Sequence, residues 1–161
     1  MSLQAVRIQA PARIGVVADT HGYLHPEALD ALRGVDLVMH AGDIGDPCIL
    51  DQLRQIAPVR AVRGNMDSDA WAEALPDEVV LEAGGAKILM VHDGDRARVQ
   101  EGEYAAVIAG HSHSACRVCH CGTLFFNPGS AGACRPGKPV SVGVLQVSGD
   151  TVQGEIVLLE A

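Results

Sequence analysis

Three short apolar segments in the first half of the chain each run into a polar, glycine-containing loop, and the first two loops lead into helical patterns. Residues 13–18, 35–40 and 59–62 predict buried strands. Residues 26–33 and 47–56 predict helices, the first with a proline in its first turn and a glycine directly after its end. Strands that alternate with helices form a parallel sheet, and ligands bind to such sheets at the carboxyl ends of the strands. The polar clusters at all three strand ends therefore predict a functional site along one edge of the sheet.

The second half of the chain changes to a mostly β pattern. Strands are predicted over residues 78–82, 86–91 and 104–109, on both sides of Gly122, and over residues 140–147 and 152–159. The polar residues 94–103 fit a further helix. The order of the elements indicates a single α/β domain of the α+β type over residues 13–161. Residues 1–12 are predicted to form a loose lead-in.

Composition narrows the classes of protein that fit this chain. With 161 residues, 48% of them hydrophobic, the chain matches one folded domain and not a disordered segment. The formal net charge is −8 and only 3% of the residues are aromatic, which argues against general nucleic-acid binding, because Lys and Arg are what bind phosphate backbones. The first residues lack the pattern of a signal peptide, and no apolar run is long enough for a membrane helix. We therefore expect a cytoplasmic protein that does not bind membranes.

Five cysteines are present, and three of them fall in the segment Cys116-Arg-Val-Cys-His-Cys121. One interpretation is a zinc-binding knuckle to which His120 contributes. A structural zinc site, however, needs a second pair of ligands further along the chain, and only Cys134 follows. Because the segment also alternates like a strand, we favour small apolar strand residues over a metal site for Cys116, Cys119 and Cys121.

Polar residues gather at the ends of the predicted strands. This set consists of Asp19, His21, Asp43, Asp46, Asn65, Asp67, His92, His111 and His113. Imidazole and carboxylate ligands together suit first-row divalent metals such as Mn, Fe, Co, Ni and Zn. Each motif alone is a weak signal, since a histidine at a strand end is more often a hydrogen-bonded surface residue. This chain contains five such motifs, each at the end of an apolar run, and together they favour a metal site over solvated loops.

The order of these motifs adds a resemblance to a known family. The series Asp19-x-His21, Gly42-Asp43-x-x-Asp46, Gly64-Asn65-x-Asp67, His92 and Gly110-His111-x-His113 resembles the calcineurin-like metallophosphoesterases. The short chain and the turn at residues 127–130 are most similar to the small prokaryotic phosphodiesterase branch of that family. The resemblance implies the metallophosphoesterase fold, in which two facing mixed β-sheets form a β-sandwich flanked by helices.

The resemblance also implies a binuclear metal centre. One divalent metal would be bound by Asp19, His21, Asp43 and His113, and the other by Asp43, Asn65, His92 and His111, so that Asp43 bridges the two. Mn²⁺ is the expected metal, with Fe, Ni, Co and Zn as alternatives. A hydroxide that bridges the metals would attack phosphorus in line, which makes Asp43, Asn65 and His111 catalytic residues through that hydroxide. The implied enzyme is a metal-dependent phosphoric ester hydrolase that acts on diesters more than on monoesters.

Two positions depart from the family pattern. Many relatives have a histidine, thought to protonate the leaving group, where this chain has Met66. We therefore expect hydrolysis to depend on a good leaving group, or on water or another residue as the acid. We expect Asp46 to support the metal site instead of orienting that histidine. Asp93 stands where relatives often have glycine, and a solvated loop charge is favoured over an extra ligand. Arg63 is compatible with either a phosphate contact or a surface ion pair, and His40 is expected in the core beside the site.

A protein-interaction scaffold is the alternative to an enzyme. The retromer subunit with this fold is similar and serves as an interaction module, and loss of metal ligands would favour that role. No ligand position of the family pattern is lost in this sequence. A small phosphate ester is therefore the expected partner, and exposed strand edges are also compatible with a homodimer or a higher homo-oligomer.

Overall fold

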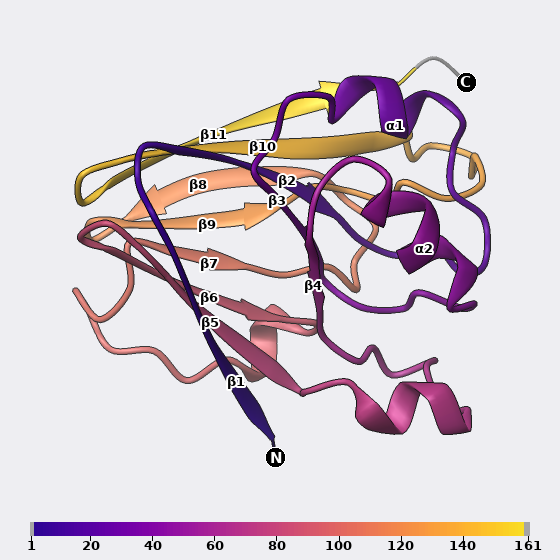
Figure 1. Cartoon of the computed structure of the whole chain (residues 1–161), viewed down its shortest axis with the longest axis horizontal. Coiled ribbons are helices and arrows are strands. Elements are labelled where there is room, and N and C mark those ends of the chain that lie inside the picture. The colour runs from indigo at the N-terminus through magenta and orange to yellow at the C-terminus, as the bar shows by residue number, and fades with distance from the viewer. Residues whose placement is uncertain (1, 160–161) are drawn as a thin grey trace.

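The computed structural model describes residues 2–159 and contains two β-sheets that face each other (Figure 1). The six-stranded sheet has the order β1-β5-β6-β7-β9-β8, and the five-stranded sheet has the order β11-β10-β2-β3-β4. The strands are β1 (Leu3–Ile8), β2 (Ala12–Val17), β3 (Leu37–His40), β4 (Val59–Ala61), β5 (Glu78–Ala83), β6 (Ala86–Val91), β7 (Ala106–Ile108), β8 (Cys116–His120), β9 (Thr123–Asn127), β10 (Ser141–Ser148) and β11 (Thr151–Leu158). The helices are α1 (Glu27–Ala31), α2 (Cys48–Arg54) and the 3-10 helices η1 (Ala70–Ala74) and η2 (Gly94–Arg96). Within residues 2–159, none of these helices has the length and apolar character needed to cross a membrane.

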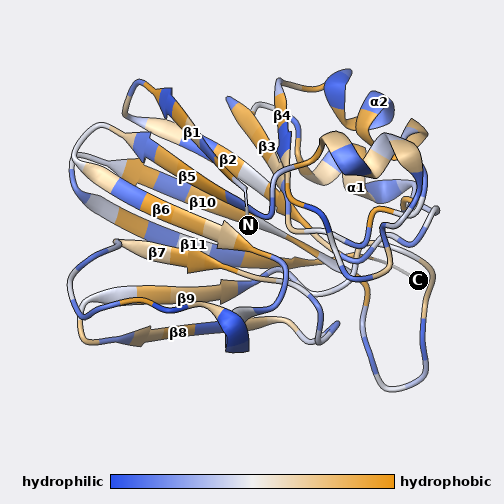
Figure 2. Cartoon of the chain, turned by 90° about the horizontal axis from the view of Figure 1, so that it is seen from below, coloured by the Kyte–Doolittle hydropathy of each residue, from blue (hydrophilic) through white to orange (hydrophobic). Residues whose placement is uncertain are grey.

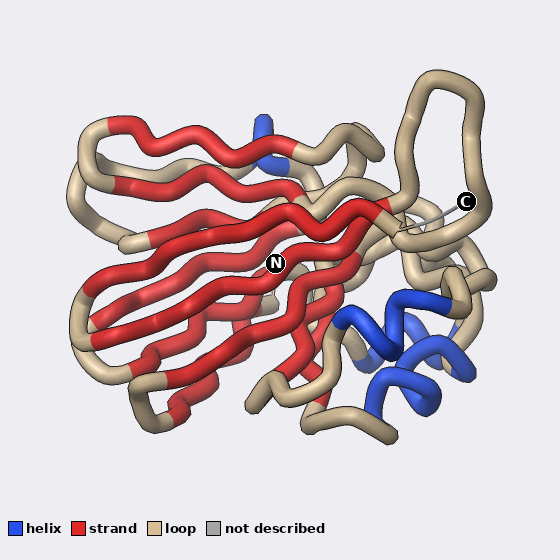
Figure 3. Tube along the Cα trace, turned by 90° about the horizontal axis from the view of Figure 1, so that it is seen from above, coloured by secondary structure: helices blue, strands red, loops and turns tan. Residues whose placement is uncertain are grey.

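The main hydrophobic core lies between the two sheets. Ile14 of β2 packs there in one cluster with Leu81 of β5 and Ile88 of β6, as expected for strands that turn alternate residues inward. A second core lies on the outer face of the five-stranded sheet. It contains Leu32, which directly follows α1, and Leu53 of α2. Figure 3 shows both helices on one side of the strands, and Figure 2 shows hydrophobic residues along the strands of both sheets. This architecture confirms the predicted β-sandwich flanked by helices.

The direction of the strands determines where the loops meet. In the five-stranded sheet β2, β3 and β4 are parallel to one another, and in the six-stranded sheet β6, β7 and β9 are parallel. The carboxyl ends of these strands lie at the same end of the sandwich, to the right in Figure 1. Loops that follow β2, β3, β4, β6 and β7 are therefore brought together, although they are distant in the sequence.

The prediction of a loose lead-in over residues 1–12 is wrong. Residues 3–8 form β1, which pairs in parallel with β5 at the edge of the six-stranded sheet. Alternate residues of β1 are half-buried, and Val6 and Ile8 pack against the main core. The polar residue Arg7 interrupts the apolar pattern because it lies on the exposed face of this edge strand, opposite the face that contacts the core.

Two further predictions about the second half need correction. The helix fitted to residues 94–103 is reduced to the single turn of η2. The cysteine-rich segment does form a strand, β8, but this is an exposed edge strand and not a row of packed apolar residues. All five cysteines are exposed and free, and none of them belongs to a group of converging metal ligands in residues 2–159.

Candidate metal centre

The residues predicted as metal ligands occupy loops with an unusual backbone conformation. Asp19, His21, Asp43, His111 and His113 all have positive φ, with values of 55°, 48°, 56°, 73° and 62°. Non-glycine residues avoid this region of backbone conformation. Each residue in it costs about 1–3 kcal/mol, and the conformation persists only where the surrounding structure holds it in place. Cys121 is the one other non-glycine residue with positive φ in residues 2–159. The strain is therefore concentrated at the end of the sandwich where the loops meet.

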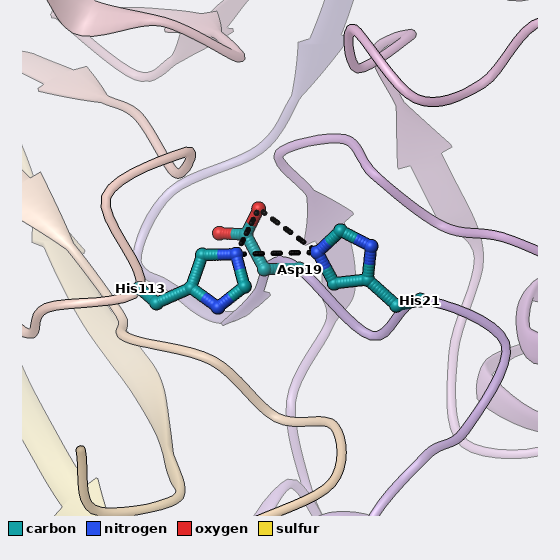
Figure 4. A group of neighbouring side chains, drawn as sticks. All are labelled: Asp19, His21 and His113. Carbon is teal, nitrogen blue, oxygen red and sulfur yellow. Dashed lines mark hydrogen bonds and ion pairs between the residues drawn. The ribbon is translucent and has the colours of Figure 1, made fainter. Parts of the chain in front are cut away.

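The first ligand cluster consists of Asp19, His21 and His113 (Figure 4). The Nε2 atoms of His21 and His113 lie 3.2 Å apart, and Asp19 Oδ1 lies 4.0 Å from the first and 3.6 Å from the second. Asp19 comes from the loop after β2 and is fully buried. Its Oδ2 accepts a hydrogen bond of 2.9 Å from the backbone N–H of His111, which ties this cluster to the loop after β7.

The second ligand cluster consists of Asp43, His92 and His111. His92 Nε2 lies 3.2 Å from Asp43 Oδ2 and 3.3 Å from His111 Nδ1. The side-chain oxygen of Asn65, from the loop after β4, lies 2.8 Å from His92 Nε2 and 3.2 Å from His111 Nδ1. Asn65 therefore adds a fourth ligand atom to this group.

Asp43 belongs to the second cluster and also lies close to the first. Its Oδ2 lies 3.2 Å from His92 Nε2 in the second cluster and 3.8 Å from His21 Nε2 in the first cluster. Its Oδ1 accepts a hydrogen bond of 2.8 Å from the backbone N–H of Met66. Gly64 allows this approach, because a Cβ at that position would collide with Asp43. One oxygen of the carboxylate is thus fixed by the backbone while the other faces both clusters.

The clusters fit divalent metal ions. Asp19 Oδ1 is buried without a hydrogen-bond partner, an arrangement that costs free energy unless a cation or another donor compensates it. His92 donates Nδ1–H to the carbonyl oxygen of Ala41 at 2.7 Å, which directs its Nε2 toward the second cluster. The mixture of imidazole nitrogens, carboxylate oxygens and one amide oxygen suits first-row metals.

Burial and hydrogen bonding set the ionisation of these ligands. Burial raises the pKa of Asp19 to about 6, lowers the pKa of His113 to about 4, and also lowers the pKa of His21. Burial would raise the pKa of Asp43, but hydrogen bonds from His92 and a backbone amide outweigh it, so this pKa lies below its usual value. The pKa of His92 is raised, because the same interaction outweighs its own burial. Neutral imidazoles offer a lone pair to a cation, and a cation would in turn favour ionised Asp19.

His40 lies fully buried beside the clusters, as predicted, and connects two of the ligand loops. Burial lowers its pKa to about 3, so the ring is neutral. Its Nδ1 accepts a hydrogen bond from the backbone N–H of Gly42 at 3.1 Å, which leaves Nε2–H to donate to Thr20 Oγ1 at 3.0 Å. The Thr20 hydroxyl donates to the carbonyl oxygen of Ile44 at 2.9 Å. This chain of hydrogen bonds joins the Asp19 loop to the Asp43 loop.

Asp67, not Asp46, is the carboxylate that supports the site. Asp67 is buried and accepts hydrogen bonds from the backbone N–H groups of Ile44, Gly45 and Gly64 at 2.9–3.1 Å. The expectation for Asp46 is wrong, because its side chain is exposed and accepts from the backbone N–H at the start of α2. The sequence places Asp67 in the polar set at the strand ends and in the motif Gly64-Asn65-x-Asp67, but it does not indicate that this carboxylate, and not that of Asp46, supports the loop.

Arg63 and Asp93, for which the sequence left two roles open, both form polar interactions in the structure. Arg63 forms an ion pair of 2.6 Å with Asp77 and lines a pocket that also contains Asn65. Asp93 accepts a hydrogen bond from the N–H of Asp95 and is not part of either ligand cluster. The ion-pair interpretation of Arg63 is therefore confirmed, and a contact between Arg63 and phosphate stays a prediction.

Comparison with known sequences agrees with the geometry. A family model described as the calcineurin-like phosphoesterase superfamily domain matches residues 13–150. A probable metallophosphoesterase of Methanothermobacter thermautotrophicus is 34% identical over 158 residues, which cover 89% of this chain and 91% of the relative. A probable metallophosphoesterase of Methanocaldococcus jannaschii is 37% identical over 136 residues, 73% of this chain and 67% of the relative.

Solved structures show the same fold. Vps29 from Entamoeba histolytica, as a single mutant, has a TM-score of 0.72 at 23% identity, covering 92% of this chain and 99% of its own. An uncharacterised protein of Streptococcus pneumoniae described as a predicted phosphoesterase has a TM-score of 0.68 at 26% identity, with 91% and 89% coverage. An archaeal phosphodiesterase has a TM-score of 0.70 at 21% identity, with 90% and 99% coverage. The chain belongs to the calcineurin-like phosphoesterase superfamily, a family of metal-dependent phosphoester hydrolases.

Proposed function

We propose that the protein is a phosphodiesterase that acts through two divalent metal ions. The observation that carries this proposal is the position of Asp43, whose Oδ2 faces His21 of the first cluster and His92 of the second. A single carboxylate oxygen directed at two separate groups of ligands is the arrangement that a binuclear centre requires. Asp19, His21 and His113 would complete one site, and Asn65, His92 and His111 the other.

The chain's own residues have two tasks in this reaction. The positive-φ loops hold the ligands in a fixed arrangement, so that no reorganisation is needed when substrate binds. The neutral rings of His21 and His113 keep the first site free of protons that would repel a cation. Bound metal ions would supply Lewis-acid stabilisation of the phosphoryl charge and activation of water. Mn²⁺ is the first metal to test, because the ligand set contains both oxygen and nitrogen donors.

Two observations support a diester as the substrate. One solved structure with the same fold is described as an archaeal phosphodiesterase. At residue 66, a methionine occupies the border of the site, and its thioether has no proton to give to a leaving group. Diesters with weakly basic leaving groups need no such proton donor, which fits this site.

Hydrolysis of bis(p-nitrophenyl) phosphate tests the proposal. The metal-stripped protein is expected to be inactive and to gain activity when Mn²⁺ is added, because the ligand clusters alone contain no nucleophile aimed at phosphorus. Parallel assays with Ni²⁺, Co²⁺ and Zn²⁺ identify the preferred metal, and excess chelator added to the active enzyme provides the control. Failure of all four metals to activate a folded protein would contradict the proposal and would favour a scaffold role for this fold.

Replacement of Met66 tests the leaving-group requirement. Met66 is 65% exposed and its backbone N–H contacts Asp43, so a histidine at this position would place a proton donor at the border of the site. Met66→His is expected to speed hydrolysis of alkyl diesters on the order of 10²-fold, while aryl diesters change little, since general acid catalysis helps poor leaving groups most. Rates for a series of diesters, plotted against leaving-group pKa, give the slope, and Met66→Gln is the matched control. A wild-type slope near zero would contradict this interpretation.

A further inference from the structure

Two pockets of different character adjoin the second ligand cluster. The polar pocket has a volume of about 520 Å³ and the apolar pocket about 410 Å³. Both are lined by His111 and Asp93, so they meet beside the second cluster. Each volume lies in the range of about 300–1,000 Å³ that is typical of small-ligand sites. A molecule bound at the second cluster can therefore extend into both pockets.

The polar pocket is bordered by charged groups that are largely paired with one another. Arg63 pairs with Asp77 at 2.6 Å, and Arg96 lies 3.5 Å from Asp93. Glu78 also lines this pocket, which therefore contains more carboxylates than guanidinium groups. This surface suits an uncharged group that forms hydrogen bonds.

The apolar pocket lies on the outer face of the six-stranded sheet. Val107 of β7, Ala109 and Phe125 of β9 line it, and these three residues also belong to a hydrophobic cluster on that face. Phe126, the next residue, turns the other way into the main core, so Phe125 faces outward. Gly94 and Asp95 of η2 also line the pocket. Phe125 is half-buried and offers an aromatic side chain to this pocket.

We propose that the apolar pocket binds one flat, apolar ester group of a phosphodiester substrate, with Phe125 as a specificity-determining residue. This inference rests on the proposed function and specifies its substrate class. A phosphodiester carries two ester groups that leave phosphorus in different directions, and two pockets meet at the cluster where phosphorus would lie. A monoester would fill only one of them. Aromatic rings gain about 0.5–1.5 kcal/mol from stacking beyond the burial of area, which corresponds to a three- to tenfold change in affinity.

Competitive inhibition by two phosphonates tests the pocket separately from turnover. Phenylphosphonate carries a flat ring and methylphosphonate does not, while both present the same acid group to the metals. With the Mn²⁺-loaded protein, we expect phenylphosphonate to bind at least threefold more tightly than methylphosphonate. Phe125→Leu keeps an apolar side chain in the hydrophobic cluster but removes the flat face, and it is expected to abolish most of this preference. Calorimetric binding of both phosphonates to each protein gives the same ratio without hydrolysis.

A control variant separates the effect of the pocket from the effect of removing any exposed apolar side chain from this sheet. Leu3→Ala changes an exposed apolar residue on β1, at the other edge of the six-stranded sheet, that does not line the pocket, and it should keep the full preference for phenylphosphonate. Phe125→Leu should also raise KM for bis(p-nitrophenyl) phosphate about three- to tenfold with kcat unchanged. Equal binding of both phosphonates to an active wild-type enzyme would overturn the inference but leave the phosphodiesterase intact. A protein that hydrolyses no diester and binds neither phosphonate would instead overturn the proposed function.

Discussion

Asp43→Asn is expected to lower the metal-stimulated hydrolysis of bis(p-nitrophenyl) phosphate by about 10³-fold or more. The reason lies in the fixed orientation of this side chain. Asp43 Oδ1 accepts the backbone N–H of Met66 at 2.8 Å, so the oxygen of an asparagine would take that place. The NH₂ group would then occupy the position of Oδ2, which faces His21 and His92. A neutral donor would thus stand where the proposed two-metal centre would require a negatively charged oxygen.

Thermal unfolding distinguishes loss of metal from loss of fold. At a Mn²⁺ concentration of about 100 times Kd, binding should stabilise the wild type by about 2.7 kcal/mol. For a protein of this size, that raises Tm by about 5–10 °C. Asp43→Asn should lose most of this shift while the metal-free protein still unfolds cooperatively. Asp46→Asn is the matched control, because Asp46 is exposed in the same loop and accepts a hydrogen bond from the backbone N–H of Cys48. If Asp43→Asn keeps both activity and the Mn²⁺ shift, the metal centre cannot depend on Asp43.

The positions of the ligand loops could be predicted from the sequence because strand direction alone brings them together. Each apolar run that ends in a polar motif became a strand, and the parallel pairing of β2, β3 and β4 placed their ends side by side. The same holds for β6 and β7 in the other sheet. Local pattern and the rules of parallel sheets therefore suffice to locate a site at this end of the molecule.

The details of the site depend on contacts between distant segments, and these have no local signal. Asp46 and Asp67 are both acidic residues in glycine-containing loops, but only Asp67 points inward to three backbone amides. The pairing of β1 with β5 joins residues 75 positions apart, and its apolar pattern is weak because only one face touches the core. The positive φ of residues such as His111 is likewise imposed by the packed loops and not by residue type.

The backbone strain also connects the stability of the loops with metal binding. Residues in the positive-φ region persist only where surrounding hydrogen bonds hold them. In the Asp43 loop those bonds come from two buried side chains, His40 and Asp67. Removal of either support should let the loop relax, so that Asp43 no longer faces both clusters. Stability and metal affinity are therefore expected to fall together when this support is lost.

Asp67→Ala is expected to lower the free energy of unfolding of the metal-free protein by about 3–5 kcal/mol. The buried N–H groups of Ile44 and Gly64 and the partly buried N–H of Gly45 lose their acceptor in this variant. Each unsatisfied buried donor costs about 1–3 kcal/mol, and partial relaxation of the loop reduces the sum. Urea unfolding followed by circular dichroism measures the change, since the midpoint should fall while the slope stays constant.

Metal affinity provides the second readout for Asp67, because a residue that orients a ligand loop affects binding as well as stability. Loss of such support typically weakens metal binding by 10- to 100-fold, so titration calorimetry of Asp67→Ala should show a rise in the Kd for Mn²⁺ of about that size. If this variant does not fold, Asp67→Asn keeps one acceptor oxygen and should show an intermediate loss of stability. Asp46→Ala removes an exposed carboxylate with one backbone partner and is expected to cost only about 1 kcal/mol with unchanged Mn²⁺ affinity. Equal effects of the Asp67 and Asp46 substitutions would show that the inward hydrogen bonds of Asp67 do not hold the loop.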